Sequence, residues 1–303
     1  MTVRFDDRVA IVTGAGAGLG RTHALLLASR GAKVVVNDPG GSVDGTGGAN
    51  AVADKVVAEI REAGGEAVAS YASVADEAAA ASIIQTAMDK WGRVDALVCN
   101  AGILRDKAFN NMSMEDYVFV NQVHHFGTAF CVKAAWPVMR KQQYGRIVVT
   151  TSSSGTVGNF GQANYGAAKM AVNGLINVLR LEGAKYNIRC NAISPSAYTR
   201  MTEALLPPDI APWMKPELVS PMVAWLCSEE CDQNGEIFAA SAGNFARVQY
   251  FATEGVQFDP AEPVSIEMIR DSLGKIRDLG TARPYTGLFG MVVEKLRAMG
   301  RIK

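Results

Sequence analysis

Short apolar runs alternate with longer amphipathic segments along most of this chain. The runs are rich in β-branched residues and predict buried strands at 9–12, 33–38, 66–71, 94–100, 145–151 and 187–193. The segments between them predict helices at 21–31, 51–63, 76–91, 114–142, with Pro137 as a kink, and from about residue 164. Strands that alternate with helices form a parallel sheet covered on both faces, so we expect an α/β, Rossmann-type, doubly wound fold.

The last helix of this series and the C-terminal part add detail. Core spacing in the helix is carried by five apolar residues, Ala168, Val172, Leu175, Ile176 and Leu179. We expect one domain over residues 1–245 and a small helical extension over 246–303, with helices near 266–276 and 287–299. The extension is either a lid or subunit contact, or a pair of solvated surface helices, and the sequence leaves both open.

Bulk composition excludes several classes of protein. The 303 residues carry 30 basic and 30 acidic side chains and are 49% hydrophobic, as suits an α/β protein with a large core. A neutral balance gives no electrostatic footprint for nucleic acid or an anionic membrane. Among five cysteines only Cys227 and Cys231 have a paired-ligand spacing, and there are only three histidines, so we expect reduced thiols and no metal site. We expect no secretory signal, no membrane span and a cytoplasmic location.

A glycine cluster follows the first apolar run. The segment 13–20, TGAGAGLG, lies between a strand and a helix, and an acid ends the next strand. Such a turn lets a dinucleotide pyrophosphate approach the backbone at a helix N-terminus. Asp38, placed to accept hydrogen bonds from the adenosine ribose, would repel a 2′-phosphate, which favours NAD over NADP. The glycine-rich loop at 40–49 is either mobile or a lid over the cofactor.

Candidate chemistry follows the fifth strand. Ser152 ends that strand, and Tyr165 and Lys169 lie one turn apart on the next helix. A positive charge beside the phenol would lower its pKa, so that Tyr165 acts as a general acid/base while Ser152 holds the substrate oxygen. A tyrosine and a lysine at this spacing also occur as a simple surface pair. That alternative is rejected because the glycine turn at 14–20, Asn100, Ser152 and the residues after Ile193 all belong to the same edge of the predicted sheet.

These motifs together resemble the short-chain dehydrogenase/reductase family over about residues 5–240. The resemblance implies catalysis by Ser152, Tyr165 and Lys169. It also implies cofactor contacts from a larger set, namely Gly14, Gly18, Leu19, Gly20, Asp38, Ser73, Val74, Asn100, Ala101, Gly102, Tyr165, Lys169, Ile193 and Thr199. Ser73 and Val74 stand where many members have an acid, and Pro195-Ser196 replaces a proline-glycine.

One position of the family's proton relay differs. His124 stands where most members have an asparagine, three residues before Gly127. Its ordinary pKa lies near working pH, so it is a candidate relay; alternatively its backbone carbonyl or a water does the work and the ring packs. Asn121 is one turn earlier and is not the relay residue, and His125 is expected to be structural.

Several stretches, among them VVVNDPGG, NAGILRD and MVAWLCSEECDQNGE, are similar to the (3R)-hydroxyacyl-CoA dehydrogenase units of type 2 multifunctional β-oxidation enzymes, also called 17β-hydroxysteroid dehydrogenase type 4. This implies NAD-dependent oxidation of a 3-hydroxyacyl-CoA, with a steroid side chain as one possible acyl group. The alternatives are a hydroxysteroid dehydrogenase, a 3-ketoacyl-carrier-protein reductase and, in another class, a non-catalytic dinucleotide sensor. The family resemblance also implies a homodimer or homotetramer, with Ala167, Ala168, Ala171 and Gly174 letting that helix approach a copy of itself.

Overall fold

The computed structural model describes residues 2–48, 50–203, 206–285 and 287–302. The chain forms two compact units, residues 1–247 and residues 248–303. The first unit holds the motifs on which the sequence interpretation depends.

The strands of the first unit confirm the six predicted runs. They are β1 Val9–Thr13, β2 Lys33–Asn37, β3 Glu66–Ser70, β4 Ala96–Cys99, β5 Gly145–Thr150, β6 Ile188–Ser196, β7 Ile237–Ser241 and β8 Asn244–Val248. The pattern of apolar runs did not predict β7 and β8. It also ended β6 three residues early, because Pro195 and the serines beside it are poor strand formers outside a sheet.

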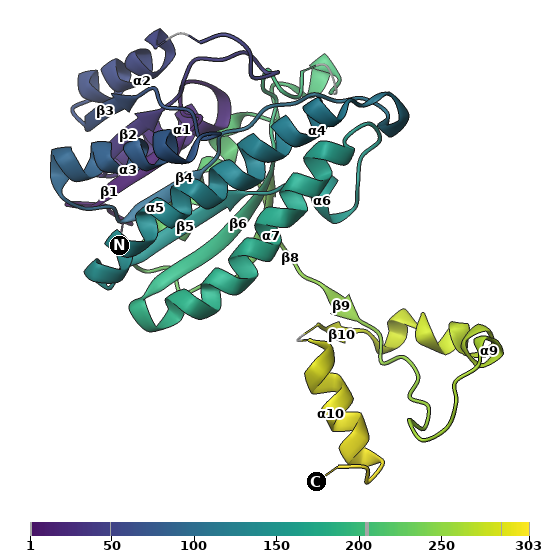
Figure 1. Ribbon diagram of the computed structural model, residues 1–303. Coiled ribbons are helices and arrows are strands. Elements are labelled where there is room, and N and C mark those ends of the chain that lie inside the picture. The colour runs from purple at the N-terminus through teal and green to yellow at the C-terminus, as the bar shows by residue number, and fades with distance from the viewer. Residues whose placement is uncertain (1, 49, 204–205, 286, 303) are drawn as a thin grey trace. The chain divides into compact units, whose positions relative to one another are not determined.

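Helices cover both faces of this sheet (Figure 1). They are α1 Gly18–Ser29, α2 Ala51–Glu62, α3 Glu77–Trp91, α4 Met114–Asn121, α5 Gly127–Gln142, α6 Ser153–Thr156, α7 Ala163–Gly183 and α8 Ser220–Cys227. Short 3₁₀ turns are η1 Phe109–Asn111, η3 Ala184–Tyr186, η4 Pro208–Ile210 and η5 Pro216–Leu218. α1 contacts α2 and α8, while α5 contacts α3 and α7, so the two groups form the two outer layers.

The expected single helix over 114–142 is wrong in one respect. A π-helical segment, η2 Gln122–Phe126, separates α4 from α5, and Pro137 lies inside α5. π-helical turns accommodate one extra residue per turn and are frequent at functional sites. This turn carries His124.

The core positions of α7 are only partly as expected. Ala168, Val172 and Ile176 are fully buried, whereas Leu175 and Leu179 are half-buried at its edge. Because Ala168 faces the core, it does not belong to a surface on which a second copy could pack. That part of the sequence prediction is wrong.

The order of strands places the site. In the sheet the order is β3-β2-β1-β4-β5-β6-β7-β8, and β1 pairs in parallel with both β2 and β4. The chain builds outward from β1 in one direction and then returns to its other side, which makes β1/β4 the switch point where ligands of such sheets bind. The expected doubly wound α/β fold is confirmed.

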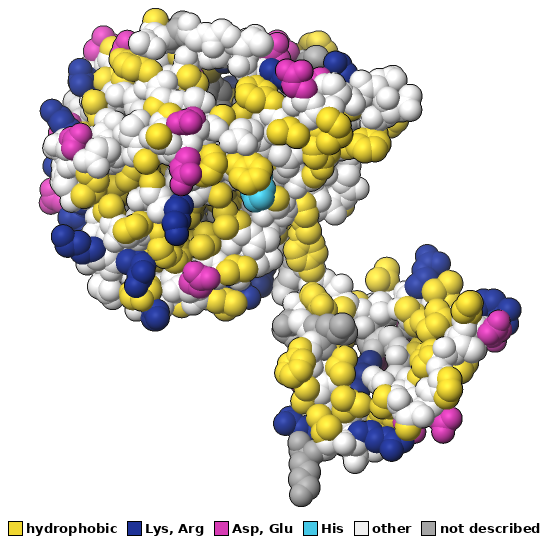
Figure 2. All heavy atoms as spheres, viewed as in Figure 1, with side chains coloured by type: hydrophobic (Ala, Val, Ile, Leu, Met, Phe, Trp, Pro, Cys, Tyr) yellow, Lys and Arg dark blue, Asp and Glu magenta, His cyan; other side chains and the backbone are white. Residues whose placement is uncertain are grey.

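The second unit is small and shows a different balance of burial. It contains β9 Phe251–Ala252 paired with β10 Arg283–Pro284, the helices α9 Ile266–Ile276 and α10 Leu288–Ala298, and the turn η6 Leu279–Thr281. None of the α9 side chains is buried. Hydrophobic and charged side chains are interspersed on its surface (Figure 2).

Two further sequence expectations concern absences. Among the described residues, no helix has both the length and the apolar character that a membrane span requires. Within the same ranges, no three side chains of the metal-binding types gather into a cluster. All five cysteines are buried and unpaired as disulfides.

Candidate active site

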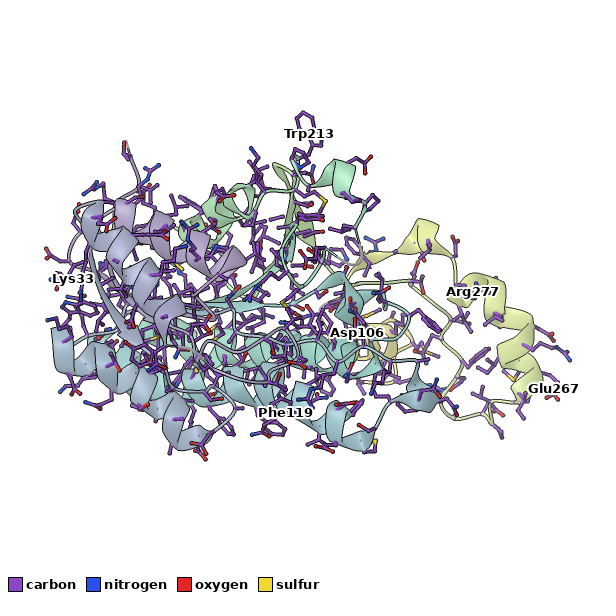
Figure 3. The ribbon with its side chains drawn as sticks, turned by 90° about the horizontal axis from the view of Figure 1, so that it is seen from above. Lys33, Asp106, Phe119, Trp213, Glu267 and Arg277 are labelled. Carbon is purple, nitrogen blue, oxygen red and sulfur yellow. The ribbon has the colours of Figure 1, made fainter. Side chains whose placement is uncertain are left out.

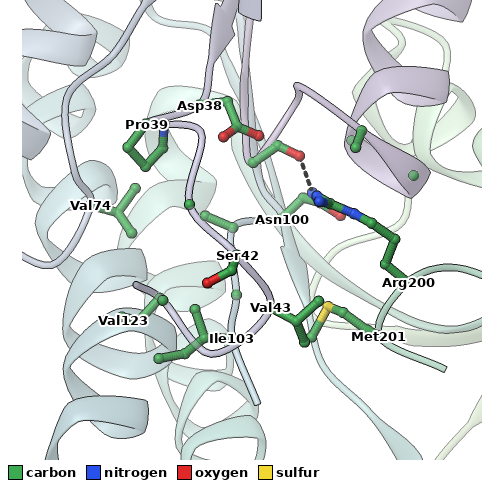
Figure 4. Close-up of a pocket in the computed structure, with 18 of the residues that line it drawn as sticks. Asp38, Pro39, Ser42, Val43, Val74, Asn100, Ile103, Val123, Arg200 and Met201 are labelled. Atoms are coloured by element: carbon green, nitrogen blue, oxygen red, sulfur yellow. Dashed lines mark hydrogen bonds between the residues drawn. The ribbon is translucent and has the colours of Figure 1, made fainter. Parts of the chain in front are cut away.

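A cavity of about 540 Å³ opens at the carboxyl ends of β1, β2 and β4. Asp38 and Ser42 reach it from the loop after β2, Asn100 from the end of β4 and Arg200 from the loop after β6 (Figure 4). Most of the residues expected to bind the cofactor line it: Gly14, Gly18, Leu19, Gly20, Asp38, Ser73, Val74, Asn100, Ala101, Gly102 and Thr199. The fold therefore brings together residues that lie up to 185 positions apart, from Gly14 to Thr199.

Two glycines make the turn after β1 possible. Gly14 has φ 63°, and a Cβ there would lie 2.7 Å from the Cα of Ala101. A Cβ on Gly20 would lie 2.1 Å from the carbonyl oxygen of Gly14. The amide of Asn100 donates to the carbonyls of Thr13 and Gly14, at 3.0 and 3.1 Å, which ties the end of β4 to this turn.

The N-terminus of α1 is left available to an anion. Its N-cap, Ala17, offers no side-chain acceptor, and the first turn contains no acid. The first amide groups of a helix have no partner within it and carry the positive end of the helix dipole. A diphosphate placed in the cavity would meet these amides, so the residues present fit a dinucleotide.

Asp38 stands at the end of β2 with both carboxylate oxygens engaged. One oxygen accepts from the backbone amide of Gly16 at 2.8 Å, and the other accepts from that of Gly40 at 2.7 Å. These bonds fix the carboxylate at the rim of the cavity while each oxygen keeps a free lone pair. A ribose hydroxyl could donate to those lone pairs.

The glycine-rich loop after Asp38 lies against the cavity rather than apart from it. Leu104 donates its amide to the carbonyl of Val43 at 2.9 Å, and the Arg105 guanidinium donates to the carbonyl of Asp44 at 2.9 Å. Arg105 in turn pairs with Asp116 at 3.0 Å and stacks over Phe119. Of the two alternatives for this loop, a mobile segment or a lid over the cofactor, its placement favours the lid.

Ser152, Tyr165 and Lys169 lie together at the end of β5. Ser152 caps α6, and its hydroxyl is hydrogen-bonded to the phenol of Tyr165. The Lys169 ammonium lies 5.4 Å from the centre of the Tyr165 ring and donates to the carbonyl of Thr150 at 2.6 Å. The hydroxyl of Thr151 donates to the carbonyl of Lys169, which binds β5 to α7.

The expected acidification of Tyr165 is wrong for this structure. Burial raises the pKa of Tyr165 to about 12; the hydrogen bond from Ser152 opposes this rise, and the charge of Asp106 adds to it. Burial also lowers the pKa of Lys169 to about 7. A lysine that is only partly charged near neutral pH gives the phenolate little help, so desolvation outweighs the neighbouring amine.

His124 is held against the backbone of the loop after β4. Its Nε2 lies 2.8 Å from the carbonyl and 3.0 Å from the amide of Ile103, and its ring meets that of Tyr165 edge-on at 5.0 Å. Burial, with the charge of Lys169, lowers its pKa well below the ordinary value. The expectation that His124 titrates near working pH is therefore wrong, and a relay role stays a prediction.

The other sequence candidates are placed less centrally. Ile193 is fully buried in β6 and does not line the cavity. The amide of Asn121 donates to the carbonyl of Tyr117, and the His125 ring lies against Phe126. Thr199 lines the cavity, and its backbone amide donates to the hydroxyl of Thr202 at 2.9 Å.

Sequence reasoning missed several residues near the site. Arg200 and Met201 line the cavity from the loop after β6, where the altered proline motif obscured the register. Asp106 and Gln162 are joined by a hydrogen bond of 2.6 Å beside Ser152 and Tyr165. NAGILRD and GQANY contain them, but neither residue has a spacing that reveals a partner 56 positions away.

Comparison with known proteins identifies the family. The sequence model of the short chain dehydrogenase family matches residues 8–208. This chain belongs to that family. Together with the similarity to multifunctional enzymes below, membership makes it an oxidoreductase that acts on a hydroxyl group and uses a nicotinamide dinucleotide.

Three curated relatives are similar over most of this chain. A short-chain type dehydrogenase/reductase of Mycobacterium tuberculosis is 53% identical over 278 residues, which cover 92% of this chain and 96% of the relative. The peroxisomal multifunctional enzyme type 2 of Drosophila melanogaster is 48% identical over 98% of this chain but only 51% of its own length. The hydroxyacyl-CoA dehydrogenase ChsB1 of M. tuberculosis is 35% identical, with 86% and 87% covered.

Two solved structures agree with the fold. Full-length multifunctional enzyme type 2 of D. melanogaster superposes with a TM-score of 0.83 at 42% identity, covering 99% of this chain and 51% of that one. A 7α-hydroxysteroid dehydrogenase complexed with NADH gives 0.71 at 30% identity, covering 79% and 95%. This chain thus spans about half the length of the multifunctional protein that it resembles.

Proposed function

We propose that this protein oxidises a 3-hydroxyacyl-CoA to the 3-ketoacyl-CoA with NAD. The observation that carries the proposal is the placement of Ser152, Tyr165 and Lys169 beside one another on a sheet edge that also carries a dinucleotide-sized cavity. The similarity of this protein to a hydroxyacyl-CoA dehydrogenase and to multifunctional enzyme type 2 supports this substrate class.

The cavity would hold NAD with groups that suit each of its parts. The amides at the start of α1 would meet the diphosphate, and Arg200 adds a positive charge on the opposite loop. Asp38 would accept from the adenosine ribose hydroxyls, and its charge disfavours the 2′-phosphate of NADP. NAD, when bound, would supply the hydride acceptor for the alcohol carbon.

The chain's own residues would handle the proton and the oxygen. Tyr165 takes the proton of the substrate hydroxyl, and Ser152 donates a hydrogen bond to the oxygen as negative charge builds there. Lys169, held on the carbonyl of Thr150, keeps a donor close to this centre. His124 secures the backbone of Ile103 beside them, whether or not it also relays a proton.

The decisive experiment measures NADH formation on short, long and sterol-derived 3-hydroxyacyl-CoAs, with free steroid alcohols alongside. We expect turnover of at least one acyl-CoA, and its loss in Tyr165→Phe while NADH binding is kept. Tyr71→Phe, the same change at an exposed tyrosine outside the cavity lining, serves as the control. Oxidation of free steroids alone, or a Tyr165→Phe enzyme of near-normal activity, would contradict the proposal.

We also propose that the protein is a homo-oligomer. Large apolar side chains remain 41–67% exposed on α4 and α7: Met114, Val118, Met170, Val178 and Leu181. The helix is open at Gly174, where a Cβ would meet nothing within 4 Å. A second copy packed on this face would remove that apolar surface from water. A monomeric mass in light scattering would refute this proposal.

A further inference from the structure

A chain of hydrogen bonds leads away from Ser152 to a charged residue that sequence reasoning did not single out. The Ser152 hydroxyl donates to that of Ser154 at 3.3 Å, and Ser154 donates to the amide oxygen of Gln162 at 2.8 Å. Gln162 is 5% exposed, and its amide nitrogen donates to Asp106 at 2.6 Å. This series of hydrogen bonds begins at the Ser152 hydroxyl, which is proposed to hold the substrate, and ends on the Asp106 carboxylate.

The Asp106 carboxylate determines the direction of every hydrogen bond in this series. An ionised carboxylate only accepts hydrogen bonds, so the amide nitrogen of Gln162 must face Asp106 and its oxygen must face Ser154. That oxygen also accepts from the amide of Asn159 at 3.1 Å. The Ser154 hydroxyl therefore donates its single hydrogen bond to Gln162, and the Ser154 oxygen accepts the hydrogen bond from Ser152.

Ser152 is thereby held with a defined use for each of its atoms. Its oxygen accepts from the backbone amide of Ser154 at 3.1 Å, and its single proton is shared between two acceptors, the Ser154 hydroxyl at 3.3 Å and the phenol of Tyr165. A long bond between neutral groups is weak, so the Ser152 hydroxyl can readily redirect this hydrogen bond to a better acceptor, such as the substrate oxygen as negative charge builds there.

Asp106, which is labelled in Figure 3, is fixed in place by the contacts of its two neighbours in the chain. The carbonyl of Arg105 accepts from the amide of Asn164 at 2.9 Å, and the backbone amide of Lys107 donates to the carbonyl of Gly161 at 2.9 Å. These contacts join the loop after β4 to the start of α7. The position of the Asp106 carboxylate relative to Tyr165 is therefore fixed.

We propose that Asp106 and Gln162 are positioning residues of the oxidation: Asp106 fixes the amide of Gln162, and Gln162 fixes through Ser154 the orientation of the Ser152 hydroxyl. The inference rests on the proposed function, because it assumes that Ser152 holds the substrate oxygen. Neither residue is placed to react with the substrate; both orient Ser152, and Asp106 in addition places its charge near Tyr165.

The charge of Asp106 gives this role a signature that simple packing lacks. The titratable and charged groups that face Tyr165 are Lys169 on α7, His124 on η2 and Asp106, with Ser152 hydrogen-bonded to the phenol. Asp106 is the acid among them, and its charge raises the pKa of Tyr165. Removing that charge favours the phenolate, the form that accepts a proton from an alcohol.

The test uses the full chain and the acyl-CoA that it oxidises best. Asp106→Asn should move the rising limb of kcat/KM against pH to lower pH, because the phenolate then forms more easily. Glu115→Gln removes a charge from the exposed start of α4 and should leave the limb in place. Ser154→Ala should lower kcat about fivefold with little change in the KM for NAD, the cost of one hydrogen bond. Ser154→Thr, which keeps the hydroxyl, should restore it.

The outcomes separate the two proposals. An unmoved limb in Asp106→Asn together with a normal kcat in Ser154→Ala would overturn this inference while leaving the proposed function standing. Equal losses in Ser154→Ala and in Ser153→Ala, an exposed neighbour on α6, would also overturn it, since the effect would then be structural. An inactive wild-type enzyme would refute the proposed function and this inference with it.

Discussion

Replacing Asp38 by asparagine should change which dinucleotide the protein prefers. The two side chains have nearly the same shape, so asparagine can keep one acceptor toward the amide of Gly16 or Gly40, which lie 2.8 and 2.7 Å from the carboxylate. What it removes is the negative charge. Hydrogen bonds to a charged acceptor contribute about 1 kcal/mol more than those to a neutral one, so NADH should bind about fivefold more weakly.

The effect on NADPH has the opposite sign. Two unit charges about 5 Å apart repel by about 3 kcal/mol at an effective dielectric constant of about 20. Asp38 is half-buried, so solvent and salt screen part of this repulsion, and about 1.5 kcal/mol is a reasonable share. Its removal should strengthen NADPH binding by about tenfold, which changes the preference between the two cofactors by about fiftyfold.

Fluorescence titration of NADH and NADPH against the wild type and Asp38→Asn measures both constants directly. Asp89→Asn, which removes an exposed acid from α3 outside the cavity lining, is the matched control and should leave both unchanged. The reasoning is refuted if Asp38→Asn leaves the ratio of the two dissociation constants where the wild type has it. In that case the adenosine ribose does not lie at the end of β2.

Three further predictions follow from single contacts. Since the pKa of Tyr165 is raised to about 12, the rate of alcohol oxidation should increase with pH across the alkaline range, while reduction of the ketone should slow; a flat profile in both directions would contradict this assignment. Gly20→Ala places a Cβ 2.1 Å from the Gly14 carbonyl oxygen and should lower the free energy of unfolding by about 2 kcal/mol or more. Gly174→Ala, where a Cβ meets nothing within 4 Å, should leave the melting temperature unchanged or raise it. Arg146 is 1% exposed and donates to the carbonyls of Ser228, Gly145 and Asn187, so Arg146→Met should cost about 3 kcal/mol in a denaturant titration; a loss below about 1 kcal/mol would mean that these carbonyls find other donors.

The sequence by itself determined the elements and the edge of the sheet at which chemistry is placed. Apolar runs and amphipathic segments have periods of about 2 and 3.6 residues that can be recognised locally, so the six parallel strands and the long helices were predictable. The glycine turn was predictable for the same reason, because Gly14 and Gly20 serve a turn that is completed within a few residues. Helical spacing likewise placed Tyr165 and Lys169 on one face.

Only the tertiary structure decided how these groups behave. The direction of a pKa shift depends on the surroundings, and the burial that raises the pKa of Tyr165 and lowers that of Lys169 comes from segments far away in the sequence. The contact of His124 with Ile103 requires a π-helical turn that no periodicity predicts. Asp106 and Gln162 meet because two loops are joined across the sheet edge, and a partner 56 residues away leaves no local pattern in the chain.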